Sequence, residues 1–96
     1  MIRHICMFKL KEENKEANLK EALVRVEKLR NIEQIKRFEV VVNDKEAPDS
    51  NYELSLIFDF DDMKELEIYQ KDQRHVEFGD FIKQVRESRA CIDYKF

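Results

Sequence analysis

The spacing of apolar residues changes along the chain from that of a strand to that of a helix and back, and the order of these changes constrains the fold most. Residues 52–60, YELSLIFDF, alternate apolar and polar side chains, as a strand does. Residues 14–30 instead place apolar side chains three and four positions apart, as an amphipathic helix does. Similar patterns predict strands over residues 2–10, 35–43 and 90–96, and helical runs over residues 63–70 and 75–87.

The resulting order is strand, helix, strand, strand, helix, strand, with the second helical part made of two runs. This βαββαβ order is the split βαβ, ferredoxin-like pattern. It predicts an α+β fold in which the helices cover one face of a four-stranded antiparallel sheet. We expect residues 1–96 to form a single domain.

The sheet face opposite the helices is also expected to be apolar. If Phe8 and Phe58 point toward the helices, then Ile5, Met7 and Ile57 lie on the opposite face. An apolar sheet face is normally covered in a folded protein. The sequence therefore predicts a homodimer that joins two copies through the sheet face opposite the helices.

Charge and hydropathy exclude some classes of partner. Charged residues make up 41% of the chain, the formal net charge is -3, and basic residues alternate with acidic ones instead of clustering. Nucleic-acid binding proteins carry a basic patch, so nucleic acid is not expected as a partner. The longest apolar stretch, LSLIF, is far shorter than the roughly 18 residues of a membrane span. We therefore expect a cytoplasmic protein that does not insert into a membrane.

The cysteines and histidines are too few and too far apart in the sequence to suggest a metal centre. Cys6 and Cys91 lie near opposite ends of the chain without the CxxC spacing of many zinc sites, and there are two histidines. No metal or cofactor is predicted. In a cytoplasmic protein the two cysteines are expected to be reduced thiols.

Three segments resemble a known family over essentially the whole chain. They are MIRHICMFKLK at the start, FDFDDMKELEIYQKDQRHVEFGDF, and the terminal IDYKF. The chain resembles the stress-responsive A/B barrel (Dabb) domain. This resemblance implies a homodimeric α+β barrel. Most members have no assigned biochemical role, while some plant relatives are polyketide cyclases that use a tyrosine and a helix histidine as acid and base.

The resemblance also implies roles for four residues. It maps the general base onto His75, the phenol onto Tyr69, the strand histidine onto His4, and a nearby carboxylate onto Asp93. The family's usual His-Pro-Ala segment is replaced here by residues 72–74, Asp-Gln-Arg. Strand alternation alone predicts that Asp93 points away from the helices, whereas the resemblance implies that it points toward the base. Three of the four also have an ordinary structural interpretation, as a core aromatic for Tyr69, a partly exposed residue or helix cap for His75 and a hydrogen-bonded histidine for His4.

Three functions are therefore compatible with the sequence. The leading hypothesis is a homodimer of unassigned biochemical role in which each subunit binds a hydrophobic metabolite in a small, mostly apolar pocket. The alternative is a cofactor-free enzyme, similar to the cyclases or to cofactor-independent monooxygenases, with His75 as base and Tyr69 as acid. A third is a structural dimer with a collapsed core. The predicted pocket-lining residues are His4, Cys6, Phe8, Leu54, Leu56, Phe58, Phe78 and Asp93.

Overall fold

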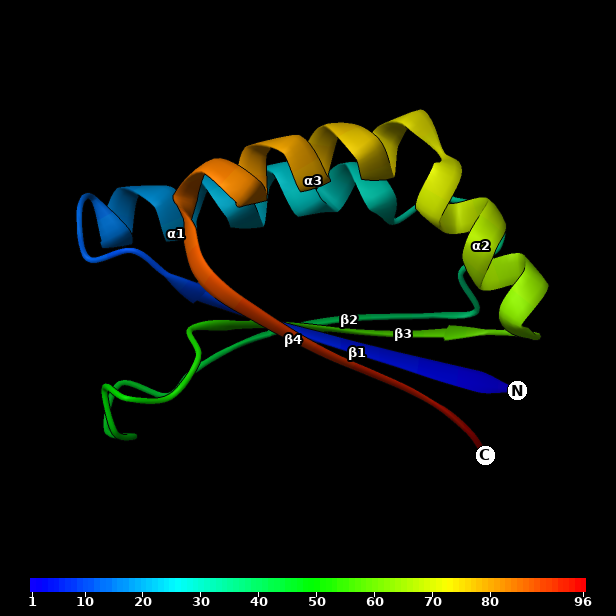
Figure 1. The fold of residues 1–96 in the computed structure, drawn as a ribbon, viewed down its shortest axis with the longest axis horizontal. Coiled ribbons are helices and arrows are strands. Elements are labelled where there is room, and N and C mark those ends of the chain that lie inside the picture. Colours follow the sequence, from blue (N-terminus) through cyan, green and yellow to red (C-terminus); the bar gives the residue numbers. More distant parts are fainter.

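The computed structural model describes residues 1–96 and has a sheet on one side and helices on the other (Figure 1). The four antiparallel strands are β1 (Ile2–Leu10), β2 (Arg37–Val42), β3 (Leu54–Phe60) and β4 (Arg86–Lys95). Their order across the sheet is β2-β3-β1-β4. The helices are α1 (Lys15–Val26), which continues into the 3₁₀ turn Glu27–Leu29, α2 (Met63–Lys71) and α3 (Gln73–Val85). The predicted α+β, ferredoxin-like fold is confirmed.

The helical segment after β3 is broken into two helices at a single residue. Asp72 has an extended backbone, with φ -62° and ψ 136°, and it ends α2 and begins α3. Its carboxylate accepts a hydrogen bond from the backbone N–H of Arg74, as an N-cap does. α3 therefore begins at Gln73, two residues before the predicted start, and turns sharply away from α2 (Figure 1).

The core lies between the sheet and the helices and consists of 16 buried apolar residues. Alternate residues of β1 point into it, from Ile2 through His4 and Cys6 to Leu10. Burial is favourable at about 25 cal/mol per Å² of apolar surface, so this alternation fixes which face of β1 meets the helices.

The opposite sheet face is partly apolar and open. Met7 is 37% exposed and Ile92 is 60% exposed on this face. Ile92 lies there because it pairs directly with Ile5, while the next residue, Asp93, pairs with the buried His4. The alternation argument that turned Asp93 away from the helices is therefore wrong, and the direction implied by the family resemblance is correct.

The expectation that both cysteines are reduced thiols is wrong. Cys6 of β1 and Cys91 of β4 are joined by a disulfide. The two residues are directly opposite in the strand register, with Cα atoms 4.2 Å apart, so the pairing of the first and last strands brings the sulfurs together. The expectation of a cytoplasmic protein, which rested partly on free thiols, loses that support.

None of the helices combines the length and the apolar character that crossing a membrane would require.

Candidate functional site

A cavity of about 350 Å³ lies between the sheet and helices α2 and α3. The strands β1 and β3 contribute mainly apolar side chains to one side of the cavity, and α3 contributes the largest share of the lining. Residues lining the cavity are His4, Cys6, Phe8 and Leu56 from β1 and β3, Tyr69 and Gln70 from α2, His75, Val76, Phe78, Gly79, Asp80, Ile82 and Lys83 from α3, and Arg86 and Arg89 from β4. A volume of this size lies within the range of small-molecule sites.

Tyr69 brings a phenol to the end of the cavity where α2 meets α3. Its side chain is 1% exposed and its ring packs against those of Phe58 and Phe60, with ring centroids 5.9 and 5.0 Å away. Burial raises the pKa of Tyr69 well above its ordinary value, so the hydroxyl keeps its proton at neutral pH. Tyr69 also lines the cavity, where its hydroxyl is available as a hydrogen-bond donor.

His75 lies in the first turn of α3, with its ring 4.6 Å from that of Tyr69. Its Nδ1–H donates a hydrogen bond to the backbone carbonyl of Gln70 at 2.9 Å, which leaves Nε2 as the acceptor nitrogen. Burial is the largest cause of a lowered His75 pKa, and the positive charge of Arg89 acts in the same direction. At neutral pH the imidazole is therefore uncharged and able to take a proton.

The turn before His75 holds this orientation without the family's His-Pro-Ala segment. The Asp72 carboxylate accepts hydrogen bonds from the backbone and from the guanidinium of Arg74, at 2.8 to 2.9 Å. These contacts begin α3 at a defined residue and place the His75 ring between Gln70 and Tyr69.

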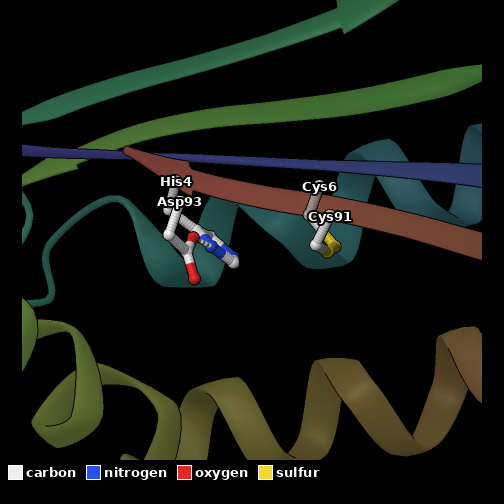
Figure 2. The surroundings of a disulfide bond; sticks show 4 residues. All are labelled: His4, Cys6, Cys91 and Asp93. Atoms are coloured by element: carbon white, nitrogen blue, oxygen red, sulfur yellow. Dashed lines mark hydrogen bonds and ion pairs between the residues drawn. A yellow bond between two sulfur atoms is a disulfide. The ribbon is translucent and has the colours of Figure 1, made fainter. Parts of the chain in front are cut away.

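His4 and Asp93 form a second polar pair, on the sheet side of the cavity. They are opposite one another on β1 and β4, and the His4 Nδ1–H donates to the Asp93 carboxylate at 2.5 Å. His4 is 5% exposed, so the carboxylate satisfies a buried imidazole. Both side chains point from the sheet toward the helices (Figure 2).

The mouth of the cavity is basic. Lys83, Arg86 and Arg89 line it from the end of α3 and the start of β4, and Asp80 is the one acidic residue among the lining side chains. Lys83 and Arg89 are exposed, so this end of the cavity faces solvent. Such a mouth attracts a ligand that carries a negative charge.

The predicted pocket residues divide into two groups. Those that line the cavity are His4, Cys6, Phe8, Leu56, Tyr69, His75 and Phe78. Leu54, Phe58 and Asp93 do not line it. Phe58 is stacked on Phe38 with ring centroids 4.7 Å apart, Leu54 is buried in the core, and Asp93 lies behind His4.

The sequence analysis missed the basic mouth and the open space beside Gly79. Gly79 lines the cavity, and a Cβ built at this position would meet nothing within 4 Å. His75, Gly79 and Lys83 follow one another at intervals of four residues, so they share a face of α3. That spacing was a usable signal for the composition of the cavity wall.

One group of side chains at the cavity could hold a metal ion. A ring nitrogen of His4 and the sulfurs of Cys6 and Cys91 all lie within 4.8 Å of one another. In the structure the two sulfurs are bonded to each other.

Comparison with known protein families gives one match over nearly the whole chain. The model of the Dabb family, described as the stress responsive A/B barrel domain, matches residues 2–96. No curated protein sequence matches the chain.

Solved structures with the same fold include a dimeric protein of unknown function, a Dabb family protein and a monooxygenase. A dimeric protein of unknown function from Bacteroides fragilis is 30% identical, with a TM-score of 0.86 over 99% of this chain and 95% of that chain. A Dabb family protein from Mesorhizobium loti is 28% identical, with a TM-score of 0.82 over 99% of this chain and 95% of that chain. An antibiotic biosynthesis monooxygenase is 18% identical, with a TM-score of 0.82 over 100% of this chain and 98% of that chain. At that identity the monooxygenase shows a shared fold alone.

Proposed function

Because the chain belongs to the stress-responsive A/B barrel family, we propose that it is a homodimer in which each subunit binds a small, mostly apolar metabolite in the cavity beside Tyr69 and His75. The observation that carries this proposal is the cavity of about 350 Å³ with two hydrogen-bonding groups facing it. Tyr69 offers a donor and His75 an acceptor, and burial strengthens the hydrogen bonds that the two side chains would make to a ligand in the cavity. An open cavity argues against a collapsed core.

The proposed ligand has an apolar body and an anionic end. The sheet floor, with Phe8 and Leu56, suits an apolar group, whereas Lys83, Arg86 and Arg89 at the mouth suit a carboxylate or a similar anion. A ligand of this shape would place its charged end in the exposed mouth and would direct its remaining polar atoms to the Tyr69 hydroxyl and the His75 Nε2.

Anilinonaphthalene sulfonate, an apolar aromatic anion that fluoresces when bound in apolar surroundings, tests this proposal directly. We expect saturable binding to one site per subunit, weakened by Lys83→Glu because the mouth then loses a positive charge. Lys20→Glu on the exposed surface of α1 makes the same charge change away from the cavity and is the matched control. If Lys20→Glu weakens dye binding as much as Lys83→Glu does, the dye responds to the overall charge of the protein and not to the cavity.

The dimer is proposed to form through the open sheet face. Met7, Ile92 and Tyr94 are between 37% and 60% exposed there, and a second hollow of about 490 Å³ beside Met7 and Val41 leaves room for side chains of a second copy. The similar protein from Bacteroides fragilis is dimeric. A stable interface buries more than about 1,000 Å² in total, which requires most of this face.

Light scattering of two variants tests the interface. Ile92→Asp places a charge on the open sheet face and is expected to convert the dimer to monomer. Val24→Asp is the control, since Val24 is 65% exposed on α1, away from the sheet. A dimer that survives Ile92→Asp but not Val24→Asp would assign the interface to the helices.

The second candidate function is cofactor-free proton transfer. His75 Nε2 would take a proton from a carbon next to a carbonyl group, and the Tyr69 hydroxyl would donate a hydrogen bond to the enolate oxygen that develops. The specific observation in favour is the pair of adjacent rings, 4.6 Å apart, in which the base is neutral and the phenol is protonated.

Hydrogen–deuterium exchange at the α-carbon of β-keto acids, followed by NMR, tests this candidate without knowledge of the natural substrate. We expect Tyr69→Phe to slow the exchange by about 10² to 10³-fold while leaving the free energy of unfolding nearly unchanged, because it removes only the hydroxyl. His75→Ala should abolish enzyme-dependent exchange. Exchange that persists in both variants at the wild-type rate would exclude the pair as acid and base.

A further inference from the structure

Two neighbouring pairs of side chains from the first and last strands lie on the side of the sheet that faces the helices: His4 with Asp93, and Cys6 with Cys91 (Figure 2). His4 and Cys6 are two positions apart on β1 and therefore point to the same face, while Cys91 and Asp93 lie opposite them on β4. His4 and Cys6 are 5% and 3% exposed, whereas Cys91 is exposed. The pairing of β1 with β4 thus assembles a nitrogen, two sulfurs and a carboxylate from distant parts of the sequence.

The distances among these atoms suit a metal ion once the sulfurs are separated. A tetrahedral Zn²⁺ has Zn–S bonds of about 2.3 Å and Zn–N bonds of about 2.0–2.1 Å, which separates its ligand atoms by about 3.5–3.8 Å. In the structure the candidate atoms of His4, Cys6 and Cys91 all lie within 4.8 Å of one another. Small rotations of the two cysteine side chains would bring three ligands to these distances.

Asp93 prepares the histidine for this role. It accepts a hydrogen bond from the His4 Nδ1–H, so the lone pair is on Nε2. A carboxylate bonded to the second nitrogen of a metal-binding histidine fixes the orientation of the ring and raises its basicity. The cavity, lined by His4 and Cys6, leaves a fourth coordination position open to a water or ligand atom.

We propose that, when the disulfide is reduced, His4, Cys6 and Cys91 form a site for one thiophilic divalent cation such as Zn²⁺, with Asp93 as the positioning residue. Thiolate and imidazole ligands select this class of cation over Mg²⁺ and Ca²⁺. The site is independent of which metabolite the cavity binds.

The redox step is balanced by a dithiol reductant. The reductant supplies two electrons and two protons, the bond between the two sulfurs breaks, and the dithiol becomes a disulfide in turn. Binding of the cation then displaces the two thiol protons to solvent. A small-molecule disulfide reverses the step: it takes up two electrons and leaves as two thiolates, while the sulfurs of Cys6 and Cys91 bond to each other again. The cation then loses two of its three ligands and is released, so the protein holds either the disulfide or the cation.

Cobalt is the probe, because tetrahedral thiolate-bound Co²⁺ absorbs strongly in the near ultraviolet and visible ranges whereas hexaaqua Co²⁺ does not. The protein is reduced with a phosphine, which is then removed without oxygen, and Co²⁺ is titrated in. We expect one equivalent per chain to give the thiolate charge-transfer band, and Zn²⁺ to remove it. The oxidised protein should give no band, and oxidation of the loaded protein with a small-molecule disulfide, which is reduced to two thiols, should abolish the band.

The chain provides matched controls, since it has two histidines and both line the cavity. His4→Ala and Cys91→Ser should remove the band or shift it to that of a site with fewer ligands, while His75→Ala should retain it. Asp93→Asn should keep the band but weaken Zn²⁺ affinity by about 10 to 100-fold, as loss of such a carboxylate does.

Circular dichroism of each reduced variant shows whether it remains folded. The proposal is overturned if the reduced, folded wild-type protein gives no tetrahedral cobalt spectrum. It is equally overturned if His4→Ala and His75→Ala bind cobalt alike, because the cation would then be held elsewhere.

Discussion

Gly79 offers a test in which stability and ligand binding are expected to move independently. It lies in the middle of α3, its φ is negative, and a Cβ there would meet no atom within 4 Å. Glycine in a helix interior is about 0.8–1 kcal/mol less favourable than alanine. Since no contact opposes the added methyl group, we expect Gly79→Ala to raise the free energy of unfolding by about 0.5–1 kcal/mol. For a domain of this size that corresponds to a rise in Tm of about 2–8 °C.

Gly79→Leu is the companion variant. Leucine has nearly the helix propensity of alanine, so the helix should gain similar stability, but the longer side chain extends into the cavity. We therefore expect a protein that is at least as stable as the wild type and that binds anilinonaphthalene sulfonate much more weakly. Thermal unfolding by circular dichroism and dye fluorescence give the two measurements on the same samples.

Two results would refute this reasoning. A fall in Tm for Gly79→Ala would mean that the space beside the helix is filled, for instance by a partner subunit or a tightly held ligand. Undiminished dye binding by a folded Gly79→Leu protein would mean that the dye occupies another surface and that the cavity is not the binding site.

Three further predictions concern pH, an ion pair and the disulfide. Burial lowers the pKa of His75 in the folded protein below the ordinary value of 6.5. The contribution of the neutral imidazole to the free energy of unfolding is therefore fully present above pH 6.5 and is lost as the pH falls from 6.5 to the lower pKa of the folded state. NMR titration of His75 should give a midpoint below 6.5. Arg3→Ala should lower Tm more than Arg25→Ala does. Loss of Arg3 leaves the buried Asp59 carboxylate without its partner, whereas Arg25 forms its ion pair on the surface of α1. Equal falls in Tm for the two variants would contradict this prediction. Reduction of the disulfide, which links residues 85 positions apart, should lower the free energy of unfolding by about 4–5 kcal/mol if loop entropy dominates, as urea titration would show.

The sequence predicted the fold because the central strands carry a clear period of two. The alternate residues of β1 and β3 that face the helices are buried, and most of those between them are only partly so; residues such as Phe8 and Phe58 therefore mark the side that meets the helices. β4 has no such pattern, since most of its ten residues are exposed at the sheet edge. The side of the sheet to which each β4 side chain points could be found only from the register of β4 with β1. Alternation alone therefore placed Asp93 on the wrong side.

The candidate site was predictable in part. The positions of His75 and Tyr69 followed from helical spacing and from the family resemblance, and the structure places their rings side by side. The disulfide was not predictable, because it depends on Cys6 and Cys91 being directly opposite in register, and strand adjacency without register does not fix the distance between two sulfurs. The cap at Asp72 was also missed, because the apolar period that predicted the helix began only at His75, three residues after the cap.

The strand β4 connects the two faces of the sheet and hence the two proposals. Cys91 and Asp93 point to the side of the sheet that faces the helices, whereas Ile92 and Tyr94 point to the open face where a second copy is proposed to bind. β4 is an edge strand whose only neighbour in the sheet is β1. A dimer interface over Ile92 and Tyr94 would restrain the backbone that holds Asp93 against His4. Dimer-breaking substitution at Ile92 should therefore weaken Co²⁺ binding by the reduced protein, and an unchanged affinity in the monomer would show that pairing with β1 alone is sufficient.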